Sequence, residues 1–528
     1  MKIAKGMILL LLALAPPALA APPESFDKRV EELRKSAELP GLAIAIVENG
    51  KPTLAKGYGF RQLGAPAPVD ADTIFPNAST GKAFTSAALA RLVDEGRIAW
   101  DDRVIDHLPW FRMYDPYVTR EMTVRDLLVH RSGLGLGAGD LLFVPRSNLS
   151  RRESVKRLAY IKPATSFRSG YAYDNILYMV AGQLIEEVTG KTWEEYIAAN
   201  IFAPAGMTVS TSDNDKRFAT ANRAFPHARV DGGLRGAGKI ERLDERDELG
   251  RNAAPAGGLA VSANDMVRWL QIQLAMGAIP EGGRLYSEKQ ATEMWTPVVL
   301  QPNPPLPERL KLTQPMFTSY ALGWTVRDYR GAKLVWHSGG IFGFVSVVVL
   351  LPEKNVGFAI LTNGEEGSIR TGLMYELIDH YLGLPRENWP ETVTALTKER
   401  VAGALKALET RAAAPAKIGP SLSLDRYVGT YTDAWYGDIE VTQKNGKLAI
   451  NFKSTPNMSG MLEHYQYDSF VTRFSDKALE PAAVTFGLDA EGKVERVTMK
   501  AVSPVADFSW DYHDLLFTPK ATSNKRVQ

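Results

Sequence analysis

A hydroxyl and an amine stand three residues apart in the segment Phe75 to Thr85, which reads FPNASTGKAFT. Apolar residues recur at helical spacing from Ala83 onward, so we expect a helix that begins close to Ser79. Residues three apart lie on the same helix face, and Ser79 would therefore meet Lys82 near the helix N-terminus. A lysine amine in this place can help to deprotonate a serine nucleophile.

Ser-x-x-Lys alone is a weak signal, because the chain holds a second copy at Ser25 to Lys28. Two rarer fragments add to it. Tyr173-Asp174-Asn175 is the only Tyr-x-Asn of the chain, and His337-Ser338-Gly339 is the only His-x-Gly. Both are predicted to lie in loops between regular elements, where side chains from distant segments can converge.

These residue types suit a hydrolytic site. A phenol beside a lysine amine can carry a proton between a serine and its leaving group, as Tyr173 would. The amide of Asn175 can hold a substrate carbonyl, and His337 can bear charge or hydrogen-bond the tyrosine. Each residue also fits a structural role: Tyr173 as a surface residue, Asn175 as a helix cap and His337 as a histidine in a turn.

The surrounding pattern predicts an α/β (α+β) fold, with an antiparallel sheet flanked by helices and a helical subdomain. Asn49-Gly50 is a tight hairpin turn, and His337 to Gly340 is predicted to be a turn between two strands. The predicted strands are Gly41 to Glu48, Pro52 to Gly59, Lys333 to Trp336, Phe344 to Leu351 and Val356 to Asn363. The predicted helices include Phe26 to Glu38, Ile176 to Val188, Ser262 to Leu274 and a segment that Thr123 caps and Gly133 ends.

The pattern changes from Tyr427 onward to short alternating strands, which predicts a small all-β barrel-like domain. We therefore divide the chain into a signal peptide (1–20), a hydrolase domain (21–385), a helical linker (386–420) and a C-terminal barrel (421–528). The signal peptide is indicated by two lysines, a short apolar run and the small residues Ala18-Leu19-Ala20. It predicts a periplasmic or secreted protein, with no membrane contact after its removal.

Composition excludes several classes of site and partner. The chain of 528 residues has 62 basic and 60 acidic side chains, a balance that gives no reason to expect nucleic acid as a partner. It has no cysteine, which excludes disulfides, a thiol nucleophile, a cysteine zinc site and a lipid-modified cysteine. We expect no metal and no organic cofactor, and the sequence does not predict the oligomeric state.

Taken in order, the motifs resemble the class C β-lactamase and D-Ala-D-Ala carboxypeptidase-like serine hydrolases, the S12-type peptidases. The resemblance runs from about Phe26 to Leu382, and the tail is similar to the lipocalin-like domain of some members. It rests on the Ser79 segment, Leu-Leu-x-His-x-Ser-Gly-Leu at 127–134, the segment 167–175, Pro255 to Leu259, and His337 to Gly340.

The resemblance implies a role for each matching residue. Ser79 would be the nucleophile, Lys82 its activating amine and Tyr173 the second proton carrier, with His337 in the third motif. Neutral Lys82 would be favoured by burial and by a nearby cation such as protonated His337. The residues that would bind the substrate or form the oxyanion hole are Asn175, Gly339 and Gly340. The hydrogen-bond donors of the oxyanion hole would be the backbone N–H groups of Ser79 and Gly340.

One motif differs from that of class C β-lactamases, and the difference limits the reactions that we expect. The third motif is His337-Ser338-Gly339, where class C β-lactamases carry Lys-Thr-Gly, and this is similar to D-aminopeptidase-like members and to a member that cleaves linearised microcystin. We therefore predict an exported serine hydrolase that forms an acyl-enzyme on Ser79 and hydrolyses amide bonds of small or non-standard, D-residue-containing peptides. The alternatives are a carboxylesterase, a weak β-lactamase, and a non-catalytic protein that binds peptide or peptidoglycan.

Overall fold

The computed structural model of the chain describes residues 22–23, 25–246, 249–413 and 418–520. The predicted signal peptide, residues 1–20, lies outside the described residues. Within the described part, no helix is both long enough and apolar enough to cross a membrane.

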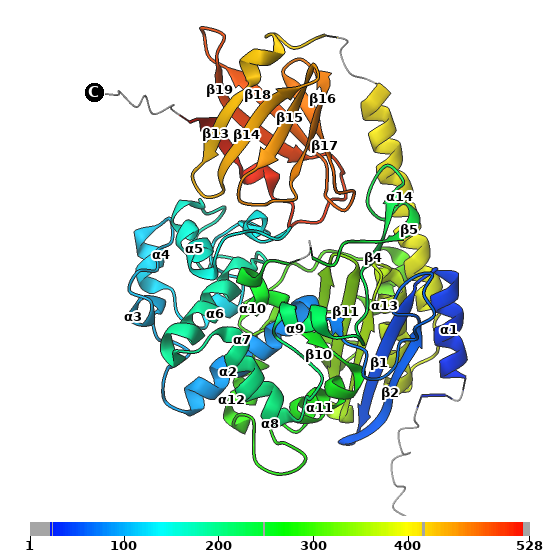
Figure 1. Ribbon diagram of the computed structural model, residues 1–528. Helices are drawn as coiled ribbons and strands as arrows, with labels where there is room; N and C mark the ends of the chain where they lie inside the picture. The colour runs from blue at the N-terminus through cyan, green and yellow to red at the C-terminus, as the bar shows by residue number, and fades with distance from the viewer. Residues whose placement is uncertain (1–21, 24, 247–248, 414–417, 521–528) are drawn as a thin grey trace, which may run out of the picture.

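The first domain is built on an antiparallel sheet of eight strands, seen nearly edge-on in Figure 1. Its central strands join segments far apart in the chain, because β1 pairs with β12 and places Leu42 opposite Thr362. In order across the sheet the strands are β2 (Lys51–Gly59), β1 (Gly41–Glu48), β12 (Val356–Thr362), β11 (Phe344–Leu351), β10 (Ala332–Ile341), β9 (Thr325–Tyr329), β8 (Thr318–Tyr320) and β7 (Val299–Leu300).

The central strands of this sheet are buried on both faces. In β1 every residue is buried, and successive side chains enter two different apolar clusters: Ala43 and Ala45 on one face, Ile44 and Ile46 on the other. A strand covered on both faces has no polar face, which is why Gly41 to Glu48 reads as a continuous apolar run.

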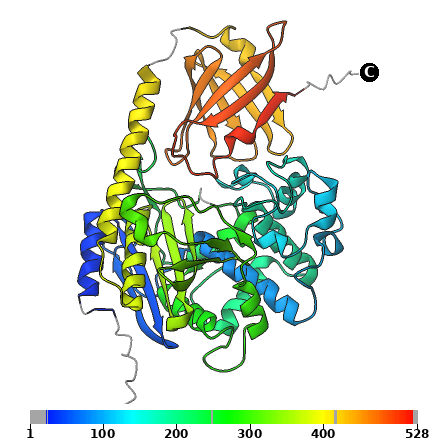
Figure 2. The ribbon, with the colours of Figure 1, turned by 180° about the vertical axis from the view of Figure 1, so that it is seen from behind.

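Helices cover the sheet from both sides. One face carries α1 (Phe26–Ser36) and α13 (Gly367–Leu382), and α14 (Trp389–Ala413) packs on α13 and rises beside the second domain (Figures 1 and 2). The other face carries α11 (Ala263–Leu274) and α2 (Lys82–Asp94), beyond which lies the helical subdomain. That subdomain includes α3 (Val104–His107), α4 (Pro116–Glu121), α5 (Arg151–Lys156), α6 (Ile176–Thr189), α7 (Trp193–Ile197), α8 (Ala203–Ala205), α9 (Asn214–Ala219), α10 (Ala254–Gly257) and α12 (Glu288–Met294).

The second domain is a closed antiparallel barrel of eight strands that sits above the first domain in Figure 1. Aromatic side chains pack inside it, among them Tyr427, Phe470 and Phe486, whose rings lie 5.0 to 5.7 Å apart. Its strands are β13 (Gly429–Asp433), β14 (Gly437–Lys444), β15 (Lys447–Phe452), β16 (Ser459–Gln466), β17 (Ser469–Phe474), β18 (Ala482–Leu488), β19 (Val494–Ala501) and β20 (Leu516–Pro519).

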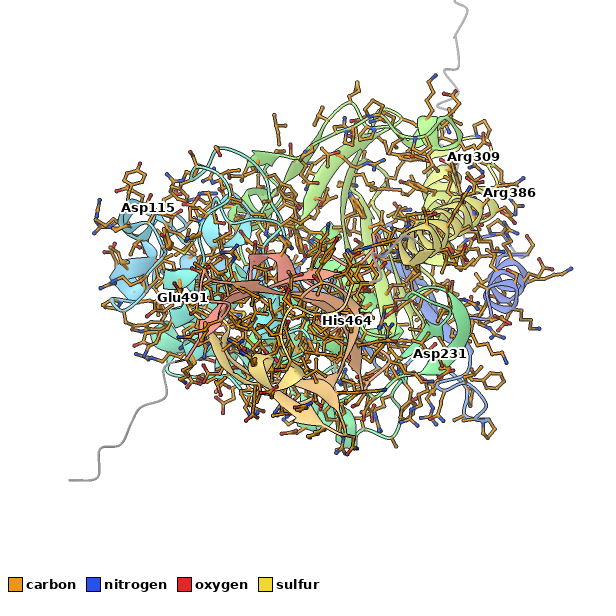
Figure 3. All side chains as sticks on the ribbon, turned by 90° about the horizontal axis from the view of Figure 1, so that it is seen from above. Asp115, Asp231, Arg309, Arg386, His464 and Glu491 are labelled. Carbon is orange, nitrogen blue, oxygen red and sulfur yellow. The ribbon has the colours of Figure 1, made fainter. Side chains whose placement is uncertain are left out.

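Short paired segments complete the architecture. The nucleophile segment is tied to α11 by β3 (Phe75–Pro76) and β6 (Ala260–Val261), and a hairpin of β4 (His227–Asp231) and β5 (Gly238–Arg242) reaches toward the barrel. Viewed from above, the barrel residue His464 lies over the middle of the molecule, Glu491 lies toward the side of Asp115, and Asp231 of the hairpin lies on the other side (Figure 3).

The predicted fold class is confirmed, but two local predictions are wrong. The segment after Thr123 forms only a 3₁₀ turn, Asp126–Leu128, although the Asp126 carboxylate accepts hydrogen bonds from the Thr123 hydroxyl at 2.7 Å and from the Thr123 N–H at 3.0 Å, as at the start of a helix. The chain then bends at His130, whose φ is +59°. The predicted turn at His337 to Gly340 is part of β10, and the turn comes at residues 342–343.

Candidate active site

Ser79 lies on a tight turn between the sheet and the helical subdomain. A 3₁₀ turn, η1 (Ala78–Gly81), leads into α2, and Ala78 holds a left-handed φ of +48°. Strand β10 lies directly against this turn. A side chain at Gly339 would place its Cβ 2.5 Å from the Asn77 carbonyl and 2.4 Å from the Ser346 hydroxyl, so only glycine fits there.

Lys82, the first residue of α2, is fully buried beside Ser79. Its Nζ lies 3.1 Å from the Ser79 Oγ, 2.7 Å from the Asn175 Oδ1 and 2.8 Å from the Ala256 carbonyl oxygen. The last two groups can only accept a hydrogen bond. A neutral amine has two N–H donors and one lone pair, so it can satisfy both acceptors and still receive the Ser79 proton.

The surroundings of Lys82 favour this neutral form. Burial lowers the pKa of Lys82 from about 10.5 to about 7, and the nearby carboxyls of Asp140 and Asp174 act in the opposite direction. The rings of Tyr173 and Tyr178 also lie 4.9 and 5.0 Å from its Nζ. The cause of the low pKa is desolvation, since charge around the amine favours its protonated form.

Tyr173 presents its ring to the Lys82 amine. Burial raises the pKa of its phenol well above the ordinary value of 10, so the group is a neutral phenol at pH 7. Its buried hydroxyl lacks a hydrogen bond of good geometry, although the Ser79 hydroxyl is near enough to work against the pKa rise. A neutral phenol can give a proton, and Lys82 is the better base of the two.

Asn175 is the residue before α6, and it links the lysine to a carboxyl that sequence analysis did not identify. Its Oδ1 accepts from Lys82, and its Nδ2 donates to the Asp140 Oδ2 at 2.9 Å. Asp140 is fully buried, and burial raises its pKa to about 7. It lies in the glycine-rich segment after Gly133, where no motif distinguished it.

A buried polar cluster supports Tyr173 from behind. The Ser132 hydroxyl donates to the Asp174 Oδ2 at 2.6 Å, and the His130 Nδ1 lies 3.2 Å from the Asp174 Oδ1. The His130 ring lies 4.1 Å from the Tyr173 ring, centroid to centroid. The motif at 127–134 contained His130 and Ser132, but sequence reasoning gave these two residues no role.

His337 cannot supply the cation that was predicted beside Lys82. Its Nδ1 donates to the Ser338 carbonyl at 2.6 Å, and its Nε2 therefore accepts from the Tyr320 hydroxyl at 2.7 Å. Burial lowers the pKa of His337 to about 3, so the imidazole is neutral. It also contacts Tyr320 rather than Tyr173, whose ring centroid lies 6.3 Å away. Its position inside β10 explains both facts.

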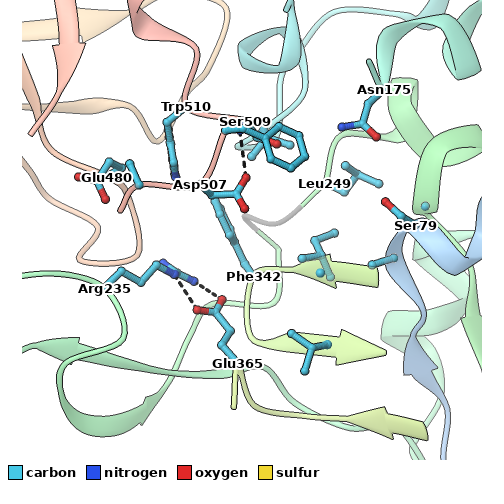
Figure 4. Close-up of a pocket in the computed structure, with 18 of the residues that line it drawn as sticks. Ser79, Asn175, Arg235, Leu249, Phe342, Glu365, Glu480, Asp507, Ser509 and Trp510 are labelled. Atoms are coloured by element: carbon cyan, nitrogen blue, oxygen red, sulfur yellow. Dashed lines mark hydrogen bonds and ion pairs between the residues drawn. The ribbon is translucent and has the colours of Figure 1, made fainter. Parts of the chain in front are cut away.

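Ser79 opens into a cavity of about 580 Å³ between the two domains. Gly340 and Asn175 line it on the side of Ser79, and Figure 4 shows Trp510 and Asp507 of the barrel on the opposite side. Sequence analysis did not place the barrel at this site. No group of three or more His, Cys, Asp or Glu side chains in the described part of the chain is arranged to hold a metal ion.

Aromatic and charged side chains form the rest of the cavity wall. Phe342 stacks on Trp510 with ring centroids 5.8 Å apart and rings nearly parallel. Below them Arg235 forms an ion pair with Glu365 (Figure 4) and donates to the Ala478 carbonyl, so its three nitrogens are all engaged. The cavity thus presents aromatic surface beside a neutralised ion pair.

The two domains match two family models. The model described as beta-lactamase matches residues 26–386, and the model of a domain of unknown function (DUF3471) matches residues 413–519.

The chain is also similar to a named hydrolase and to a penicillin-binding protein. Unguisins hydrolase ungD of Aspergillus violaceofuscus is 27% identical over 446 residues, which cover 80% of this chain and 77% of the relative. Penicillin-binding protein 4 of Amycolatopsis lactamdurans is 29% identical over 394 residues, covering 72% of this chain and 98% of the relative.

A solved structure shares the fold of both domains. The octameric penicillin-binding protein homologue from Pyrococcus abyssi superposes with a TM-score of 0.56 at 21% identity, covering 93% of this chain and 99% of that one. The family model spans more than two thirds of the sequence and includes the Ser79 turn and β10. This chain belongs to the beta-lactamase family of serine hydrolases.

Proposed function

We propose that the protein is an exported hydrolase that forms an acyl-enzyme on Ser79 and cleaves amide bonds of small or non-standard peptides. The observation that carries this proposal is the hydrogen bonding of Lys82. Two fixed acceptors, the Asn175 Oδ1 and the Ala256 carbonyl oxygen, accept hydrogen bonds from the two N–H groups of the neutral amine. The lone pair of the amine is then left for the Ser79 hydroxyl.

The proposed reaction has two halves. Neutral Lys82 accepts the Ser79 proton while the Oγ attacks the substrate carbonyl, and the Ser79 and Gly340 N–H groups stabilise the oxyanion. Tyr173 then gives its proton to the departing amine and takes one back from protonated Lys82, and the C–N bond breaks to leave an ester on Ser79. Water attacks this ester and gives its proton to Lys82 or Tyr173, and that proton returns to the Ser79 oxygen as the C–O bond breaks and the acid leaves.

The cavity supports a small substrate with apolar side chains. Its volume of about 580 Å³ lies in the usual range for small-molecule sites. Aromatic rings of Phe342, Phe508 and Trp510 line it. The relative named unguisins hydrolase supports hydrolysis as the activity.

A fluorophosphonate probe tests the acyl-enzyme. We expect a covalent adduct on Ser79 of the wild-type protein, and none on a Ser79→Ala variant that melts at the wild-type temperature. An unlabelled wild-type protein would favour the non-catalytic peptide-binding alternative. Export is tested separately, by mass spectrometry of the protein from its native host, where we expect a chain that begins near Ala21.

Carboxylester hydrolysis is the second candidate, and the neutral His337 favours it over β-lactam hydrolysis. An ester substrate needs no cation at the third motif, whereas a penicillin carboxylate would lack its partner there. A D-amino-acid anilide, a p-nitrophenyl ester and nitrocefin separate the three activities. Fast turnover of the ester with both amides inert would refute the peptidase assignment.

A further inference from the structure

We propose that Asp140 is a positioning residue of the active site and that Ser509, from the barrel, holds it in place. This inference rests on the proposed function of Ser79 and Lys82. The Asp140 Oδ2 accepts one hydrogen bond from the Asn175 Nδ2 at 2.9 Å and a second from the Ser509 hydroxyl at 2.7 Å. A chain of four polar side chains thus runs from the barrel to the catalytic amine.

Asp140 determines the orientation of the Asn175 side-chain amide. A carboxyl oxygen attracts the NH₂ end of the amide, so the Oδ1 end is turned toward Lys82. In the opposite orientation the amide NH₂ would face the lysine amine, so that two hydrogen-bond donors would meet. The amide oxygen would then face a carboxyl oxygen of Asp140, so that two acceptors would meet. Without Asp140 the lysine would lose one of the two acceptors that direct its lone pair to Ser79.

The barrel holds the turn that carries Asp140 at several points. The Asp511 carboxylate accepts from the backbone N–H groups of Gly139 at 2.7 Å and Leu141 at 3.2 Å, on either side of Asp140. The barrel loop also lies so close to the backbone of Gly137 that a Cβ there would be 2.5 Å from the Phe508 carbonyl oxygen. The barrel loop therefore fixes the backbone as well as the side chain of this turn.

Asp140 also belongs to the charge environment of Lys82. The groups that face the amine are the carboxyls of Asp140 and Asp174, which raise its pKa, and the imidazoles of His130 and His337. From the barrel, Asp507 and Asp511 face Asp140, and the Ser509 hydrogen bond favours its charged form. Losing the Ser509 hydroxyl would make Asp140 less charged and so lower the pKa of Lys82.

Removing the barrel hydroxyl gives the first test. We expect Ser509→Ala to slow the labelling of Ser79 by a fluorophosphonate, and the turnover of p-nitrophenyl butyrate, by about fivefold, with the loss in kcat and little change in KM. Ser509→Thr keeps the hydroxyl and is expected to restore most of the rate.

Two substitutions of the carboxyl separate its orienting role from its charge. Asp140→Ala removes both, and we expect the labelling rate to fall at least about tenfold. Asp140→Asn keeps an oxygen that can accept from Asn175 and Ser509 but removes the charge. Its labelling rate should stay within about threefold of wild type at high pH, while the acidic limb of the pH profile moves to lower pH by about half to one unit.

Ser454→Ala is the matched control at the same interface. The Ser454 carbonyl accepts from the Asn148 N–H at 3.0 Å, while its hydroxyl donates within the barrel to Tyr436. This variant should label at the wild-type rate. Equal slowing of the Ser509→Ala and Ser454→Ala variants, or wild-type labelling of both Ser509→Ala and Asp140→Asn at every pH, would overturn the inference. A wild-type protein that forms no adduct on Ser79 would instead overturn the proposed function.

Discussion

Replacing Lys82 by methionine tests the central claim about this site through protein stability rather than activity. The folded protein lowers the pKa of Lys82 from about 10.5 to about 7, a difference that corresponds to about 5 kcal/mol. Between these values the unfolded chain binds one more proton than the folded chain. The free energy of unfolding must therefore rise with pH across that window, and methionine removes this contribution.

The slope is the quantity to measure. The wild-type free energy of unfolding, minus that of Lys82→Met, should increase by about 1.4 kcal/mol per pH unit between pH 8 and 10. The absolute difference is less informative, because methionine also leaves the Asn175 Oδ1 and the Ala256 carbonyl without their partner, at a cost of about 1–3 kcal/mol each. That cost does not change with pH.

Urea unfolding followed by circular dichroism at pH 8, 9 and 10 provides the assay. The second Ser-x-x-Lys copy supplies the control, since the Lys28 side chain is 81% exposed on α1 and Lys28→Met should change the free energy of unfolding by no more than about 0.5 kcal/mol. A Lys82→Met difference that is the same at all three pH values would show that Lys82 stays protonated in the fold. Lys82 could then not be the base that activates Ser79.

Three further predictions follow from the same geometry. The rate of Ser79 labelling should fall about tenfold per pH unit below pH 7 and level off above it, because only neutral Lys82 accepts the proton; a rate independent of pH from 5 to 8 would contradict this. Tyr173→Phe should reduce kcat for an anilide by about 10²- to 10⁴-fold with an unchanged melting temperature, and a smaller loss would show that another group protonates the leaving amine. Gly339→Ala should lower the free energy of unfolding by about 1–3 kcal/mol, since its Cβ would press on the Asn77 carbonyl. Wild-type urea midpoints for that variant would show that β10 does not pack tightly on the nucleophile turn.

The residues that sequence analysis brought together are those whose proximity depends on local geometry. Ser79 and Lys82 are close because a 3₁₀ turn runs directly into a helix, and spacing alone predicts this. Tyr173 and Asn175 both come just before α6, so the contact of that helix with α2 positions both. Rare motifs could identify such residues because each motif occupies one short segment.

The errors and omissions have a different physical origin. His337 was predicted to lie in a turn and to be able to act as a cation, but it lies in a continuing strand, and Gly339 is required by the close approach of η1 to that strand. Asp140 and Ser509 are 369 residues apart, and their contact depends on how two domains dock. Neither periodicity nor composition carries information about such a contact.

The neutral His337 has a consequence for charge in the whole cavity. Among the described residues that line it, Arg235 and Arg400 are basic, whereas Glu365, Glu480 and Asp507 are acidic. Arg235 is already neutralised by Glu365, so it offers no charge to a substrate carboxylate.

Burial raises the pKa of Glu480, which makes the protonated form of that side chain easier to reach. The wall around Ser79 therefore carries no excess of positive charge, and an anionic substrate would gain little from entering it. A neutral or cationic peptide with apolar side chains can bind against the aromatic wall and needs no positive charge there. The same reasoning places nitrocefin, whose carboxylate needs a cation, last among the three test substrates.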